Sequence, residues 1–114
     1  MKRIFKRKVT DNMVVEIGRL INEVQIETVK NNDGQENKVV NNTIAIYNGR
    51  NRTTYLDIMA WGGEAEFIAS YFRKDDEIYV IGELQNRTLQ KDNNVISTIV
   101  LKVSSAKRIF GRRN

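Results

Sequence analysis

Three residue types are missing from this chain of 114 residues: it has no cysteine, and it also lacks histidine and proline. Without cysteine, disulfide bonds and thiolate metal sites are impossible. Without histidine, the usual zinc sites and most acid–base pairs of enzymes are excluded as well. Any catalysis would have to rest on carboxylates, lysines or hydroxyls. We therefore expect a protein that is not an enzyme and that holds no metal or other cofactor.

Long apolar segments are missing too. No run approaches the roughly 20 residues of a membrane span. The basic N-terminal segment, MKRIFKRKVTD, has neither the apolar stretch nor the small-residue cleavage site of a signal peptide. A short amphipathic membrane anchor is the alternative for this segment, but about ten residues is marginal for a helix in water. We expect a cytoplasmic protein with no membrane partner.

The charged residues are unevenly placed along the chain. Nineteen basic and 14 acidic residues give a net charge of +5. Residues 1–10 carry five basic side chains and residues 93–114 carry another five, with no acid in either segment. The middle of the chain holds the other nine basic and all 14 acidic side chains, a net charge of −5. Because solvated basic tails are common, the overall positive charge does not by itself identify a nucleic-acid-binding fold.

Alternation of apolar and polar residues, interrupted by turn residues, predicts strands along most of the chain. The predicted strands cover residues 13–21, 24–29, 39–47, 55–61, 77–89 and 95–103. Asp33-Gly34 is a strong signal for a hairpin turn. Gly18, inside the first predicted strand, indicates a bulge or a sharp bend.

One segment has helical spacing instead. In GGEAEFIASYF the apolar residues Ala65, Ile68, Ala69 and Phe72 follow the i, i+3, i+4, i+7 pattern of an amphipathic helix. We predict about three turns of helix here. The next residues, RKDD, would close the helix with basic side chains at its C-terminal end, where the helix dipole favours them.

Strands and a single helix in the order β-β-β-α-β-β are the arrangement of an OB-fold. We predict an all-β fold with one short helix: a five-stranded, partly open barrel with the helix between strands 3 and 4. Such a barrel binds oligonucleotides or oligosaccharides on one face. The length suits one domain, which we assign to residues 11–110, between a basic N-terminal extension at 1–10 and a short basic C-terminus at 111–114.

The predicted strand YLDIMAW has two different faces. One face carries Leu56, Ile58 and Ala60. The other carries Tyr55, Asp57, Met59 and the only tryptophan of the chain, Trp61. Aromatic rings beside a charged residue indicate a binding surface, because every nucleic-acid base can stack on an aromatic ring for about 1–3 kcal/mol. The alternative is that both rings pack under the helix or a neighbouring subunit; Tyr47, outward on its own strand, is a candidate third platform.

The motifs of this chain resemble those of the bacterial-type single-stranded DNA-binding proteins. The segments that carry the resemblance are MVVEIGRLINEVQI, VVNNTIAI and YLDIMAWGGEAEFIASYFRKDDEIYVIGELQNR. They are similar to the family's I-G-R-L, A-N-x-T-L-A, W-G-x-x-A-E, Y-x-x-K-G-D and V-x-V-x-G-x-L-x-x-R motifs, in order, from about residue 12 to 110. The resemblance implies an OB-fold that coats single-stranded DNA without sequence preference, in replication, recombination or repair. It also implies a homo-oligomer, commonly a tetramer, in a bacterial cell or a phage-infected host.

The resemblance assigns roles to particular residues. Tyr55 and Trp61 match base-stacking positions, and the basic positions that face the DNA path are matched by Arg19, Lys74 and Arg87. Leu89 stands where many members have a third stacking aromatic. In the turn motif Asp75 replaces glycine, a change that the left-handed conformation tolerates. Ile81 and Glu83 replace residues that are often Glu and Arg, which removes one possible phosphate contact.

Family members usually continue into a flexible linker and an acidic tip that recruits other proteins, whereas this sequence stops at KRIFGRRN. We therefore do not expect recruitment through an acidic tail.

Phosphates need cations along a groove, and further basic residues that are candidates for phosphate contacts lie at a loop tip, before a strand and at the end of the helix. The full predicted DNA-binding set is Trp61, Tyr55, Arg19, Tyr47, Arg87, Lys74, Arg73, Arg50, Arg52 and Lys38. The basic ends would extend the electrostatic reach to DNA or merely add solubility.

Three other functions fit parts of the sequence. A primosome-type accessory protein would share the fold, lack the tail and act as a dimer. An OB-fold interaction module would use the aromatics to bind a protein partner. A nuclease would need converging carboxylates, but Asp57 is on a strand while Glu64 and Glu66 open the helix, where acids complement the dipole. Asp57, between the two rings, should repel phosphate, so we expect the DNA backbone to run away from it.

Overall fold

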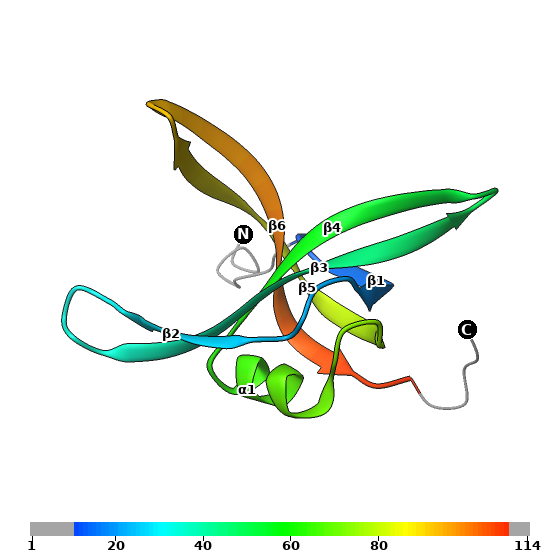
Figure 1. The fold of residues 1–114 in the computed structure, drawn as a ribbon, viewed down its shortest axis with the longest axis horizontal. Coiled ribbons are helices and arrows are strands. Elements are labelled where there is room, and N and C mark those ends of the chain that lie inside the picture. The colour runs from blue at the N-terminus through cyan, green and yellow to red at the C-terminus, as the bar shows by residue number, and fades with distance from the viewer. Residues whose placement is uncertain (1–10, 110–114) are drawn as a thin grey trace, which may run out of the picture.

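The structure is a computed structural model that describes residues 11–109, so both predicted basic ends lie outside the described residues. The elements are β1 (Val14–Leu20), β2 (Ile26–Lys30), β3 (Glu36–Gly49), β4 (Arg52–Trp61), α1 (Gly62–Tyr71), β5 (Glu77–Lys91) and β6 (Asn94–Lys107). The strands form one sheet in the order β1-β5-β6-β4-β3-β2, and an additional pairing of β1 with β3 closes it into a barrel. The β2–β3, β3–β4 and β5–β6 hairpins project from the barrel as three arms, and α1 lies at one end (Figure 1).

The first two strands explain how a five-stranded barrel arises from six strand segments. β1 ends against β3 at Leu20↔Ile44, and β2 then pairs further along the same strand, from Ile26↔Val40. β1 and β2 therefore act as one long strand interrupted at residues 21–25. Counted in this way, the barrel has five strands with α1 between the third and the fourth, and the predicted OB-fold is confirmed.

A buried side chain that the sequence did not single out, Asn42, holds this interruption in place. Its Oδ1 accepts hydrogen bonds from the backbone N–H groups of Asn22 (3.2 Å) and Thr43 (2.7 Å). Its Nδ2 donates to the carbonyl of Asn22 at 3.1 Å. These bonds satisfy backbone groups that have left the ladder, and buried backbone groups without partners are costly. Asn42 thus fixes where β1 gives way to β2.

The core lies between the inner faces of the barrel strands and α1. The predicted helix is confirmed, with Ala65 and Ile68 fully buried and Phe72 following them into the core. Among the described residues, no helix is long and apolar enough to cross a membrane. The other large side chains of the core cluster include Leu20, Ile44, Ile58, Ile78, Val80 and Leu101.

The predicted end of the helix was wrong in one respect. No basic residue lies in the last turn of α1, because Phe72 is already extended (φ −125°) and turns the chain away. Arg73 and Lys74 therefore lie in the turn that leads to β5. Asp75 in that turn is left-handed (φ 76°), as expected for the position where it replaces glycine, and its N–H donates to the carbonyl of Leu20.

The sequence predicted a bulge or a sharp bend at Gly18, and the pairing of β1 excludes the bulge. Gly18 pairs regularly with Ile78, and a Cβ there would come within 2.9 Å of the Cβ of Ile44. Glycine at 18 thus lets β1 approach β3 closely. The register shifts in the β3–β4 and β5–β6 pairings are instead at Tyr47/Gly49 and at Ile81/Gly82.

Candidate nucleic-acid interface

The outer face of β3 and β4 carries the residues that the sequence predicted to bind. Ile58 and Ala60 point into the core, as predicted, and are 1% exposed. On the opposite face Tyr55 is 65% exposed and Trp61 is half-buried. Trp61 lies directly across from the buried Val39 of β3. At about 3.3 Å per residue, the two aromatic positions are about 20 Å apart, a length that spans several nucleotides.

A second exposed tyrosine extends this face toward the β3–β4 arm. Tyr47, on β3, is 72% exposed. Because Ala45 pairs with Tyr55 and Tyr47 pairs with Thr53, the two tyrosines are diagonal neighbours on the same side of the sheet. The structure thus places two of the three predicted stacking residues together, at the opposite end of the face from Trp61.

Arg19 lies beside these tyrosines because β1 pairs with β3 at Arg19↔Ala45. Its Nη1 donates to the backbone carbonyl of Asp75 at 3.1 Å, which anchors the guanidinium at the edge of the face. Lys74, the residue before Asp75, is exposed in the same turn. A hollow of about 250 Å³ lies here, lined by Ile17, Gly18, Arg19, Ala45, Tyr47 and Glu77.

The tip of the β3–β4 hairpin carries the predicted pair Arg50 and Arg52. Gly49, Arg50 and Asn51 all have positive φ (84°, 55° and 62°), which produces a tight turn. Both arginines are exposed and lie just beyond Tyr47 along the arm. The hairpin therefore carries two cations next to the tyrosines.

The centre of the face contains an ion pair. Arg87 of β5 donates from Nη2 to Oδ2 of Asp57 at 2.9 Å, and the hydroxyl of Thr43 donates to the other carboxylate oxygen at 2.7 Å. The isolated repulsive charge expected at Asp57 is therefore compensated by a nearby cation. The sequence did not indicate this pair, because the two residues are 30 positions apart and strand alternation specifies faces but not neighbours. A hollow of about 250 Å³ beside the pair is lined by Asn22, Asn41, Asn42, Thr43, Asp57 and Arg87.

The structure does not bring all predicted residues to this face. By alternation along β3, Lys38 points to the side of Val40, opposite Val39 and Trp61. Arg73 lines a separate hollow of about 320 Å³ beside α1. Leu89, where the aromatic is replaced, pairs with Ile96 on the β5–β6 arm, and both side chains are exposed. Within residues 11–109, no group of three or more acidic side chains is placed to hold a metal ion.

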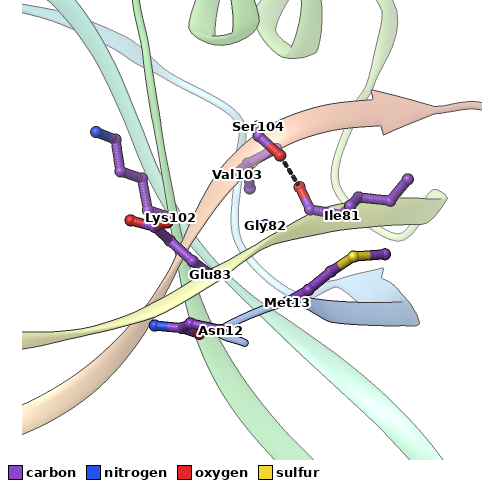
Figure 2. A pocket seen from close by; sticks show the side chains of 8 residues that line it. All are labelled: Asn12, Met13, Ile81, Gly82, Glu83, Lys102, Val103 and Ser104. Atoms are coloured by element: carbon purple, nitrogen blue, oxygen red, sulfur yellow. Dashed lines mark hydrogen bonds between the residues drawn. The ribbon is translucent and has the colours of Figure 1, made fainter. Parts of the chain in front are cut away.

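A larger hollow, of about 410 Å³, lies between β1, β5 and β6 (Figure 2). It forms where the β5–β6 ladder shifts register, next to Gly82. Two polar side chains in its wall bond to the backbone: Ser104 Oγ donates to the carbonyl of Ile81 (3.0 Å), and the amide of Asn12 exchanges two bonds with Leu84. These bonds tie the side chains of Ser104 and Asn12 to β5, so the hollow belongs to the wall of the barrel.

Residues 11–108, which span every element from β1 to β6, match the Single-strand binding protein family. The chain belongs to this family. The extension at residues 1–10 lies outside the matched range. The matched residues, 11–108, are nearly the same as the residues that the structure describes, so the structure describes the single-strand binding protein barrel.

Similar proteins carry names consistent with this membership. Single-stranded DNA-binding protein 1 of Clostridium acetobutylicum is 35% identical over 82 residues, which cover 69% of this chain and 74% of that protein. Single-stranded DNA-binding protein 2 of a Streptococcus agalactiae serotype V strain is 30% identical in an alignment that covers 90% of this chain and 86% of that protein. The single-strand binding protein motifs seen in the sequence thus agree with the match over the barrel.

Proposed function

We propose that this protein binds and coats single-stranded DNA without sequence preference, in replication, recombination or repair. The observation that carries the proposal is the set of accessible aromatic residues on one face of the family's barrel: Tyr47, Tyr55 and Trp61. Bases would stack on these rings, a contact that any base can make. The names of the similar proteins support the same ligand.

Phosphate contacts are proposed from the cations that border these rings. Arg19 and Lys74 lie at one edge, Arg50 and Arg52 at the arm tip, and Arg87 at the centre. Lys38 and Arg73 lie off the face and would contact DNA only where the DNA strand continues around the barrel.

The carboxylate of Asp57 accepts hydrogen bonds from Thr43 and Arg87, which supports a binding role over a nuclease. The cytoplasmic location and the role of the basic ends stay predictions.

The test is fluorescence anisotropy with a labelled dT oligonucleotide, a mixed-sequence single strand and a duplex of equal length. We expect the two single strands to bind with similar affinity and the duplex to bind much more weakly, because paired bases cannot stack on protein rings. Affinity should fall with added salt as phosphate contacts are screened. Equal affinity for the duplex would contradict the proposal, and absence of binding to every DNA would favour a protein-interaction module.

We also propose that copies of the chain associate through the outer face of β1 and β5. Val15 pairs with Ile81 and Ile17 pairs with Tyr79, so four apolar or aromatic side chains share this face. Met13 and Val15 are exposed in the single chain. Covering this surface would stabilise an oligomer through burial of apolar area. A tetramer is favoured, and a dimer is the alternative.

Val15→Lys is expected to break this association, because a lysine at the centre of an apolar contact would have to be desolvated. Light scattering should report a fall in mass toward that of one chain at micromolar concentration. Ser70→Lys, on the exposed surface of α1, is the matched control and should leave the mass unchanged. A wild-type protein that is already monomeric, or an unchanged mass for Val15→Lys, would refute the interface.

A further inference from the structure

The ion pair at the centre of the face raises the question of what Arg87 can offer to DNA. Asp57 belongs to β4 and Arg87 to β5, and the 2.9 Å bond between them lies on the side of the sheet that also carries Tyr55 and Trp61. Thr43 fixes the carboxylate by donating to its second oxygen. The pair is therefore held in the middle of the proposed path of the bases.

Both partners remain accessible to a ligand, with side chains 27% (Arg87) and 42% (Asp57) exposed. Of the guanidinium donors, Nη2 is bound to Asp57, and Nε is buried without a hydrogen-bond partner within the described residues. Carboxylate and phosphate are both oxyanions that bind guanidinium through charge-assisted hydrogen bonds. The guanidinium still has N–H donors on Nη1 and Nη2 for a backbone phosphate, but that phosphate would share the positive charge with Asp57 and be repelled by its carboxylate.

We propose that Asp57 is an affinity-limiting residue, an internal competitor whose carboxylate neutralises Arg87 and so weakens its attraction for a DNA phosphate. This inference rests on the proposed binding of single-stranded DNA to the outer face of β3 and β4. With DNA absent, the pair is neutral overall and Arg87 attracts phosphate weakly. With DNA bound, Arg87 divides its charge between the carboxylate and the phosphate, so it contributes less than an unpaired arginine would.

Asp57→Asn tests the proposal, because asparagine keeps the size of the side chain and an oxygen for Thr43 while it removes the charge. Affinity for a dT oligonucleotide at about 0.1 M salt should rise about two- to fivefold, the effect of one exposed ion pair. The slope of log K against log salt should become more negative by about 0.7, because Arg87 then neutralises one more phosphate.

Two controls separate this local competition from a general charge effect. Glu66→Gln removes one negative charge from the exposed surface of α1 and should leave the salt slope unchanged. Arg87→Gln should weaken binding more in the Asp57→Asn background than in the wild type. If thermal melting shows that Asp57→Asn is poorly folded, Asp57→Thr, whose β-branched side chain suits a strand, takes its place with the same expectations.

Tighter binding with a steeper salt slope, confined to the Asp57 variants, would support the proposal. Weaker binding by a folded Asp57→Asn variant would overturn it, because Asp57 would then position Arg87 for DNA. An equal gain from Glu66→Gln would also overturn it. These outcomes are distinct from failure of the proposed function, which would appear as no binding of dT by the wild-type protein.

Discussion

Trp61→Ala is expected to weaken binding of a dT oligonucleotide by about 1–3 kcal/mol, the stacking energy of one base on an aromatic ring. The indole lies at one end of the outer face, about 20 Å from Tyr55, and no other residue at that end offers an equivalent ring within the described face. Since Trp61 is the only tryptophan, the variant has to be followed by anisotropy of a labelled oligonucleotide.

The same substitution also tests the packing alternative, because Trp61 directly precedes α1 and lies across from buried Val39. Trp61→Phe keeps an aromatic ring and should retain most of the affinity. Tyr71→Ala, which removes an exposed ring on α1, is the matched control and should bind dT like the wild type. If the Trp61→Ala variant unfolds, or if light scattering shows that it has dissociated into single chains, the ring is a packing residue and the stacking role is wrong.

The second large effect is expected on stability. Gly82→Ala should lower the free energy of unfolding by about 3 kcal/mol, the upper part of the range for an extra methyl group in a packed site. A Cβ at position 82 would lie 2.0 Å from the carbonyl oxygen of Lys102 and 2.9 Å from its carbonyl carbon. Both are backbone atoms of the neighbouring strand, so relief would require β5 and β6 to separate at their bulge.

Urea unfolding followed by circular dichroism measures this effect, with Gly63→Ala as the matched control. A Cβ at Gly63 has no heavy atom within 4 Å, and the residue lies in the first turn of α1. The control should be neutral or more stable by about 0.4–1 kcal/mol, because alanine restricts the unfolded chain. Similar unfolding free energies for the two variants would show that β5 and β6 do not approach as closely at Gly82 as described.

Sequence periodicity was sufficient for most of the fold. Alternation located every strand, and the i, i+3, i+4, i+7 pattern located α1, because the barrel buries one face of every element except β2, which is exposed along its whole length. It also separated Ile58 and Ala60 from Tyr55, as burial confirms. The bulge was misplaced because Gly18 and Gly82 look alike in sequence. Only the closed barrel determines which strand passes closest to each glycine.

The candidate site was less predictable. Alternation placed Asp57 and Arg87 on polar faces of their strands but did not show that they meet, since β5 reaches β4 only through the curvature of the barrel. Asn42 was missed because a polar residue on a core face becomes interpretable only with its backbone partners, Asn22 and Thr43. Lys38 was expected just before a strand beginning at residue 39, whereas it lies within β3 and alternation turns it away from the face. Arg73 lies beyond the end of α1, where helical spacing no longer fixes direction.

The central claim, that bases stack on the outer face of β3 and β4, is tested most directly by titrating the wild-type protein with oligo-dT and following its single tryptophan. A base stacked on Trp61 should quench the emission to a saturable limit, and added salt should shift the titration to weaker binding. The claim would be contradicted if anisotropy shows that oligo-dT has saturated the protein while the Trp61 emission stays unchanged.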